Sequence, residues 1–136
     1  MKIDGGCHCG KITYEAEVDP GKVTICHCTD CQQLTGTAFR VTVFAPESDF
    51  RLISGEPKAY VKTTAESGNP RAQVFCPDCG SQLWARNVDD GPKVYGIRVG
   101  TARQRADLPP VRQIWHRSAL HWLDRIETLP AAEKAV

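Results

Sequence analysis

Seven cysteines, all confined to three short clusters, constrain the fold of this chain more than any other feature of its sequence. The clusters are Cys7-x-Cys9, Cys26-x-Cys28-x2-Cys31 and Cys76-x2-Cys79. A closed tetrahedral zinc site uses four thiolates, which leaves three cysteines here, and three protein ligands with a free fourth position are typical of a zinc ion that takes part in chemistry. The count therefore predicts two zinc ions per chain, one structural and one catalytic.

Metal binding explains the cysteines better than disulfide bonds do. Seven is an odd number, so disulfides would leave one thiol unpaired, and a Cys-x-Cys pair is a strained choice for a bridge within itself. The first residues, Met1-Lys2-Ile3-Asp4, are polar, and no apolar run approaches the roughly 20 residues of a membrane span. We therefore expect neither a signal peptide nor a membrane anchor, and a cytoplasmic protein whose thiols stay reduced.

The balance of charges argues against one class of partner. The 136 residues include 17 Lys and Arg against 16 Asp and Glu, a net charge of +1, and the basic residues are scattered among acids. Such a distribution lacks the electrostatic footprint of a nucleic-acid-binding protein. It remains compatible with a small anionic substrate that a few arginines bind.

Alternating apolar and polar residues predict a mostly-β chain that forms a single domain. One short helix is expected after Thr29, because Thr29 and Gln32 have the spacing of a capping box and Asp30 falls in the first turn. We expect residues 1–125 to form the zinc domain and residues 126–136 a flexible tail. The strands are expected over residues 11–18, 22–26, 37–44, 50–54, 59–63, 73–76, 82–85, 94–99 and 112–116.

Each cysteine cluster has a spacing that lets its sulfurs bind one ion. Cys76-Pro77-Asp78-Cys79-Gly80 is typical of a zinc knuckle, in which Gly80 supplies the positive φ that the turn needs. Cys7 and Cys9 lie on one face if the chain is extended there. Cys26 and Cys28 share a face in the same way, and Cys31 returns from the first helical turn.

Spacing alone leaves two pairings open. Cys28 and Cys31 could join Cys76 and Cys79 in an ordinary four-cysteine ribbon, which would leave the other three thiols unexplained. The alternative is a closed four-cysteine site and a separate site formed by the middle cluster. His8 and His27 lie inside Cys-x-Cys pairs, where alternation points them away from a metal, so we do not expect them as ligands.

Several strings resemble the glutathione-dependent formaldehyde-activating enzyme family, which includes centromere protein V. They are Gly6-Cys7-His8-Cys9-Gly10-Lys11-Ile12, Cys26-His27-Cys28-Thr29-Asp30-Cys31-Gln32-Gln33-Leu34-Thr35-Gly36, Phe75-Cys76-Pro77-Asp78-Cys79-Gly80-Ser81, Val99-Gly100-Thr101 and Ile114-Trp115-His116-Arg117-Ser118. The resemblance implies an Mss4-like fold of short antiparallel strands. It also implies a structural zinc on Cys7, Cys9, Cys76 and Cys79, and a catalytic zinc on Cys26, Cys28 and Cys31.

The resemblance further implies an activity: the addition of the glutathione thiol to formaldehyde, which gives S-hydroxymethylglutathione, or the reverse cleavage of its carbon–sulfur bond. Charge supports this, because three thiolates on Zn²⁺ sum to −1, which favours a thiol over water as fourth ligand. The thiol's carboxylates would need arginines, and the candidates are Arg40, Arg86, Arg98 and Arg103. The alternatives are a non-catalytic zinc-stapled binding module, as in centromere protein V, and a thiol redox sensor whose middle cluster holds no metal.

Overall fold

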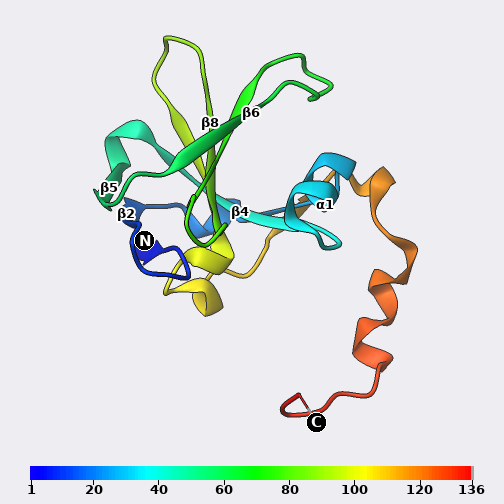
Figure 1. Ribbon diagram of the computed structural model, residues 1–136. Helices are drawn as coiled ribbons and strands as arrows, with labels where there is room; N and C mark the ends of the chain where they lie inside the picture. Colours follow the sequence, from blue (N-terminus) through cyan, green and yellow to red (C-terminus); the bar gives the residue numbers. More distant parts are fainter. Residues whose placement is uncertain (136) are drawn as a thin grey trace.

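The computed structural model describes residues 1–135, which form ten β-strands in two sheets and one α-helix (Figure 1). The mostly-β, single-domain prediction is confirmed, and the predicted strands all form within three residues of their expected ends. The strands are β1 (Lys2–Gly6), β2 (Thr13–Glu17), β3 (Thr24–Cys26), β4 (Arg40–Pro46), β5 (Phe50–Ser54), β6 (Lys58–Lys62), β7 (Arg71–Phe75), β8 (Gln82–Asn87), β9 (Val94–Arg98) and β10 (Arg112–Ile114).

The larger sheet has the order β10-β3-β4-β9-β8-β7-β6 across residues 1–135. Its neighbouring strands are antiparallel except for β10, which lies parallel to β3 with Ile114 opposite Cys26. The pairing extends past the strand ends, because Val111 N–H donates to Val23 C=O at 2.9 Å. The late strand β10 thereby covers the edge of the strand that carries the middle cysteine cluster.

The smaller sheet has the order β1-β2-β5 and packs on the larger one through aromatic side chains. Phe50 of β5 stacks on Tyr95 of β9 with ring centroids 4.0 Å apart and meets the edge of Trp84 at 4.8 Å. Tyr14 of β2, which is fully buried, joins the same group at 5.9 Å from both Phe50 and Trp84. These contacts bury apolar surface from both sheets in one core, each large side chain contributing about 2 kcal/mol.

The α-helix, α1 (Thr29–Thr35), follows the middle cluster as expected, but its cap differs from the predicted one. Cys28, rather than Thr29, is the N-cap residue, and its Sγ accepts the bond from the backbone N–H of Cys31 at 3.2 Å. Gln32 donates instead to the backbone carbonyls of His27 and Ser118, at 2.9 and 3.0 Å. The predicted capping box is therefore wrong, because the sulfur of a candidate metal ligand occupies the capping position.

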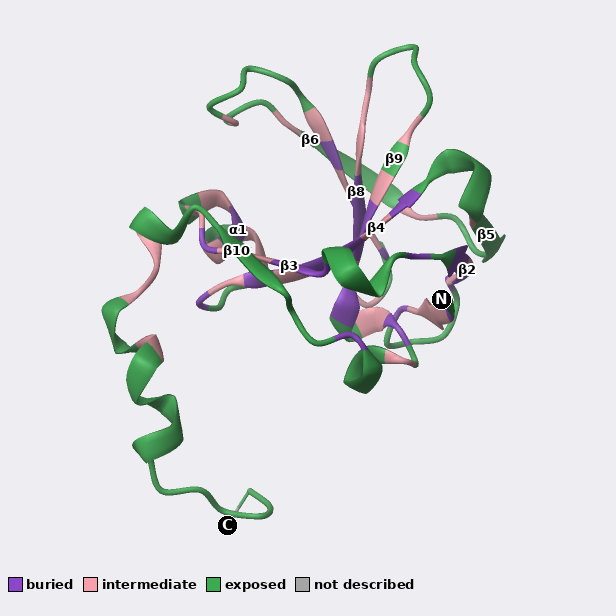
Figure 2. Cartoon of the chain, turned by 180° about the vertical axis from the view of Figure 1, so that it is seen from behind, coloured by how far each residue is buried: buried purple, intermediate pink, exposed green. Residues whose placement is uncertain are grey.

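The C-terminal part leaves the body of the molecule beyond Ser118, whose carbonyl still accepts a hydrogen bond from Gln32 (Figures 1 and 2). It forms a 3₁₀ helix, η6 (His121–Thr128), with exposed Trp122 and Ile126, and continues to residue 135 without further helix or strand. Residue 136, the last of the expected tail, lies outside the described residues.

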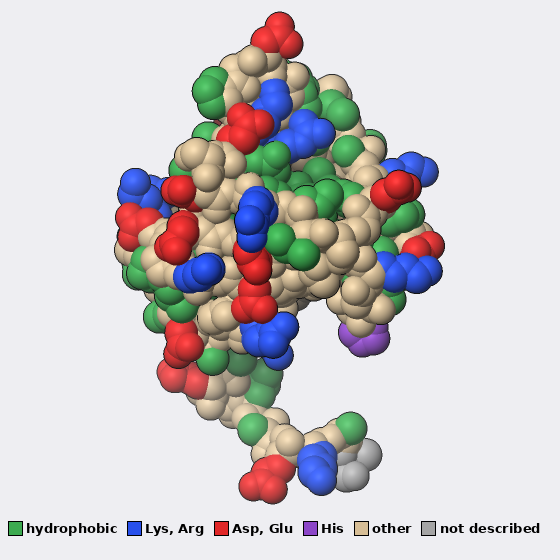
Figure 3. All heavy atoms as spheres, turned by 90° about the vertical axis from the view of Figure 1, so that its left-hand side faces the viewer, with side chains coloured by type: hydrophobic (Ala, Val, Ile, Leu, Met, Phe, Trp, Pro, Cys, Tyr) green, Lys and Arg blue, Asp and Glu red, His purple; other side chains and the backbone are tan. Residues whose placement is uncertain are grey.

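Among residues 1–135, no helix has the length and apolar character needed to cross a membrane. Acidic and basic side chains are intermixed on the face in Figure 3.

Candidate metal centres and the adjoining pockets

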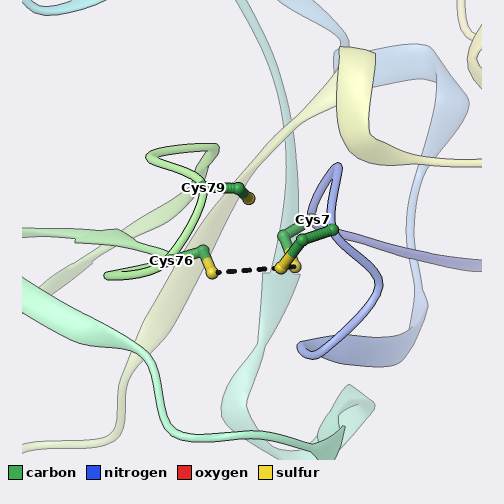
Figure 4. Close-up of side chains that lie close together, drawn as sticks. Cys7, Cys76 and Cys79 are labelled. Atoms are coloured by element: carbon green, nitrogen blue, oxygen red, sulfur yellow. Dashed lines mark hydrogen bonds between the residues drawn. The ribbon is translucent and has the colours of Figure 1, made fainter.

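Four cysteines from distant parts of the chain meet at the first candidate centre. Cys7 and Cys9 follow β1, Cys76 and Cys79 follow β7, and their four sulfurs all lie within 4.8 Å of one another. The Sγ of Cys9 is 3.5 Å from that of Cys7 and 3.8 Å from that of Cys76. In Figure 4, Cys76 and Cys79 reach toward Cys7 from a separate loop. Four thiolates so placed fit a closed tetrahedral zinc site.

Backbone geometry and hydrogen bonds hold these four sulfurs. Gly80 has φ +77°, which confirms the positive φ predicted for the turn that follows Cys79. The N–H of Ile12 donates to the Sγ of Cys7 at 3.3 Å. Hydrogen bonds from the hydroxyl and backbone of Ser81 lower the pKa of Cys79 to about 5. Donors of this kind favour the thiolate, which is the form that a metal binds.

The second candidate centre is assembled from six consecutive residues. Cys26 ends β3, Cys28 caps α1 and Cys31 lies in its first turn, and the three sulfurs lie within 4.8 Å of one another. A hydrogen bond from the Cys31 thiol lowers the pKa of Cys26 and raises that of Cys31, so one of the pair readily becomes a thiolate. The structure thus groups the cysteines as four and three. It does not bring Cys28 and Cys31 into one group with Cys76 and Cys79, as a ribbon would require.

The three-cysteine centre opens on two adjoining pockets, which share Cys28, Lys62 and Trp115. The inner pocket is a cavity of about 220 Å³, and the outer pocket one of about 340 Å³. Cationic side chains line the inner pocket beside all three cysteines: Arg40, Lys62, Arg71 and Arg98. The outer pocket has charges of both signs, from Asp30, Lys62, Glu66 and Arg117. The candidate metal centre therefore lies beside two pockets of different charge.

The structure brings two of the four candidate arginines to this site. Arg40 and Arg98 line the inner pocket, whereas Arg86 and Arg103 line neither pocket. Arg103 lies on the surface, where its Nη2 is 3.1 Å from a carboxylate oxygen of Asp4. Burial lowers the pKa of Arg40, and the nearby thiolates of the three cysteines oppose that shift. Arg40 therefore places positive charge directly beside the centre.

Sequence reasoning missed Lys62 and Arg71. The strand expected over residues 73–76 begins two residues earlier in the structure, at Arg71. Alternation along β7 places Arg71 on the same face as Gln73, which also lines the inner pocket. The sequence could have shown this for Arg71, because a strand predicted to begin at residue 71 would have placed Arg71 on the same face as Gln73.

Two further residues near the middle cluster, His27 and Trp115, do not belong to the group of candidate metal ligands. His27 is buried and is not part of the group formed by the three sulfurs, and its Nε2 donates to Gln113 Oε1 at 2.7 Å. Trp115 lines both pockets and has a left-handed φ of +55°. Such a backbone is rare for a large side chain and is often found at functional sites.

Comparisons with known proteins bear on the family and the fold of the chain. A model of the glutathione-dependent formaldehyde-activating enzyme family matches residues 2–118. Among solved structures, the crystal structure of a Rhodobacter sphaeroides protein is similar, with a TM-score of 0.60 and 23% identity over 81% of this chain and 98% of that one. That likeness shows a shared fold. No curated protein matches the sequence.

Proposed function

The chain belongs to the glutathione-dependent formaldehyde-activating enzyme family, and on that premise we propose that it is a zinc-dependent carbon–sulfur lyase or synthase. Its reaction joins a small thiol to an aldehyde, as in the formation of S-hydroxymethylglutathione from glutathione and formaldehyde or from a related pair, and the reverse reaction breaks the same bond. The observation that carries the proposal is the three-cysteine centre, which borders both pockets while offering a metal only three ligands.

We assign one zinc ion to each centre. The set Cys7, Cys9, Cys76 and Cys79 completes a tetrahedral site and suits a structural ion. The set Cys26, Cys28 and Cys31 leaves one position free. When bound there, the ion supplies a Lewis acid that favours the thiolate form of an incoming thiol.

The side chains around the middle centre supply binding and orientation. The guanidinium of Arg40, which is buried beside the three sulfurs, offsets the net charge of −1 that three thiolates and a divalent ion carry. Trp115 forms a wall of both pockets and offers an apolar surface beside the middle centre. Asp30 and Lys62, whose Oδ2 and Nζ lie 3.0 Å apart, offer both charge signs to a zwitterionic thiol such as glutathione. A glutathione-dependent reaction also suits a reducing, cytoplasmic location.

Metal content and activity test the proposal together. The wild-type protein should contain two zinc ions per chain, one of which a chelator removes more readily. It should also exchange glutathione-bound and free formaldehyde faster than the uncatalysed reaction, as measured by NMR exchange spectroscopy. Cys28→Ser should lower this rate by a factor of 100 or more, whereas Thr37→Ser, which changes an exposed hydroxyl residue, should leave it unchanged.

Each result decides between the candidate functions. Full activity in Cys28→Ser contradicts the proposed role of the middle centre. Two equally inert zinc ions without activity favour the non-catalytic binding module, as in centromere protein V. A single ion per chain, with an oxidisable middle cluster, favours the redox sensor.

A further inference from the structure

The inner pocket contains more positive charge than the reaction with neutral formaldehyde requires. Arg40, Arg71 and Arg98 line it, and no Asp or Glu side chain does so within residues 1–135. The fourth cation, Lys62, is already paired with Asp30 at 3.0 Å. Three guanidinium groups therefore share a small space without a carboxylate partner in that space.

Two of these arginines are held by a neutral acceptor. The Nη1 of Arg40 and the Nη2 of Arg98 donate to the same Oε1 of Gln73, at 2.9 and 2.7 Å. The Nε atoms of Arg40 and Arg98 are buried and have no hydrogen-bond partner in the part of the chain that the structure describes. Buried guanidinium groups normally face a carboxylate, because an uncompensated buried charge costs several kcal/mol. No carboxylate is among the hydrogen-bond acceptors of these two guanidinium groups in the part of the chain that the structure describes.

Counting charges shows what is missing. The three arginines contribute +3, and three thiolates with a divalent ion contribute −1, which leaves +2. A fourth thiolate from the bound thiol lowers the sum to +1. One further negative charge, the charge of a single carboxylate, makes the pocket neutral.

The size of the inner pocket limits what carries that carboxylate. Its volume of about 220 Å³ is below the roughly 300 Å³ at which pockets for drug-sized ligands begin. The larger outer pocket, with charges of both signs, has more room for the body of a peptide thiol. The inner pocket therefore suits a molecule of a few heavy atoms.

We propose that the inner pocket is a carboxylate-binding subsite, and that the carbonyl partner of the thiol is a small oxo acid rather than formaldehyde. This inference rests on the proposed function. In the reaction, the thiol sulfur bonds to the aldehyde carbon as the C=O π bond breaks, and the oxygen takes up the proton that the thiol loses. The product is a hydroxy thioether acid, and no oxidant or reductant is needed.

Binding of an unreactive analogue tests the subsite without catalysis. In calorimetric titrations of the zinc-loaded protein, glycolate should bind with a Kd in the millimolar range or below, and neutral ethylene glycol should not bind. Arg71→Gln, at a half-buried position, should weaken glycolate binding at least tenfold. Gln73→Glu, which supplies a carboxylate at the shared acceptor, should abolish it while the protein stays folded. Arg103→Gln removes the same charge at the surface and should bind glycolate like the wild type.

Two outcomes of the titrations would overturn the subsite: equal binding of glycolate and ethylene glycol, or equal losses of glycolate affinity in Arg71→Gln and Arg103→Gln.

Kinetics then identify which partner brings the carboxylate. Cysteamine, which has no carboxylate, should react faster with glyoxylate than with formaldehyde, by tenfold or more in kcat/KM, and Arg71→Gln should reduce that preference. If instead mercaptoacetate with formaldehyde is the fast pair, the carboxylate comes from the thiol and the oxo-acid assignment is wrong.

The two proposals fail in different ways. Glycolate binding without carbon–sulfur bond formation from any pair would contradict the proposed function and leave the subsite in place. Bond formation without glycolate binding would contradict the subsite alone.

Discussion

At the scale of single residues, Gln73 is unusual because one neutral amide oxygen accepts hydrogen bonds from two guanidinium groups, those of Arg40 and Arg98. Replacing it with Glu should stabilise the fold, because charge-assisted hydrogen bonds are about twice as strong as neutral ones. We expect Gln73→Glu to raise the free energy of unfolding by about 1–2 kcal/mol and Tm by several degrees. Gln33→Glu makes the same change at an exposed helix position and should shift stability by less than about 0.5 kcal/mol. A lower Tm in Gln73→Glu would show that another anion already neutralises the pair.

Tyr14 gives a prediction for alkaline pH. Burial raises the pKa of its hydroxyl to about 12, and that hydroxyl lies 2.9 Å from Thr101 Oγ1. Because the folded pKa exceeds the unfolded value of about 10, the neutral form stabilises the fold below pH 10, and this contribution is lost as pH rises toward 12. Urea unfolding between pH 8 and 11 should show a steeper loss of stability in the wild type than in Tyr14→Phe, which cannot ionise. Parallel pH profiles for the two proteins would refute this role.

At the scale of elements, the turn after Cys79 should couple backbone strain to metal binding. Gly80 has φ +77° and open space around its α-carbon, so Gly80→Ala should cost about 1 kcal/mol through strain alone. Gly68→Ala is a matched control, because Gly68 has φ +79° and equally open surroundings but lies outside the Cys76–Cys79 turn. Both variants should lose similar stability in thermal melts. Only Gly80→Ala should release zinc faster to a competing chelator, and equal release rates would contradict the coupling.

Most elements of the fold were predictable because alternation records which face of a strand is buried. β1 was not predicted, since two of its five residues are glycines and its pattern is too short to show a period. Tertiary packing is what forms this strand. A Cβ on Gly5 would collide with Thr101 O and Tyr14 OH, so the strand depends on close packing against a distant segment. The parallel direction of β10 was equally hidden, because pairing partners 88 residues apart leave no local trace in the sequence.

The candidate site could be predicted only where its ligands lie close together in the sequence. Spacing placed the three cysteines of the middle centre, and the family resemblance supplied the grouping of the other four. The pocket could not be predicted in this way, because Arg40, Arg71 and Arg98 come from three separate strands. Only the order of strands in the sheet brings their side chains together. Arg86 and Arg103, which line neither pocket, were equally good candidates in the sequence.

At the scale of the whole molecule, the four-cysteine centre connects the loop after β1, a strand of the smaller sheet, to the loop after β7, a strand of the larger sheet. Removing its ion should therefore destabilise the whole fold, by several kcal/mol, since binding energy at such a site is also folding energy. Cys79→Ser should lower Tm far more than Cys26→Ser, although both cysteines are half-buried. Circular dichroism melts with zinc analysis of each variant measure this. Similar Tm values would mean that the aromatic core alone holds the two sheets together.

The two centres also differ in how far apart their ligands lie along the chain. The three-cysteine set spans residues 26–31, so its ligands are all present as soon as residue 31 has been synthesised, before any sheet exists. The four-cysteine set needs partners separated by 67 residues between Cys9 and Cys76 and has to wait for the chain to fold back on itself. Under the proposed assignment of one ion to each centre, the local set is able to acquire its ion first during synthesis, before the fold closes around it.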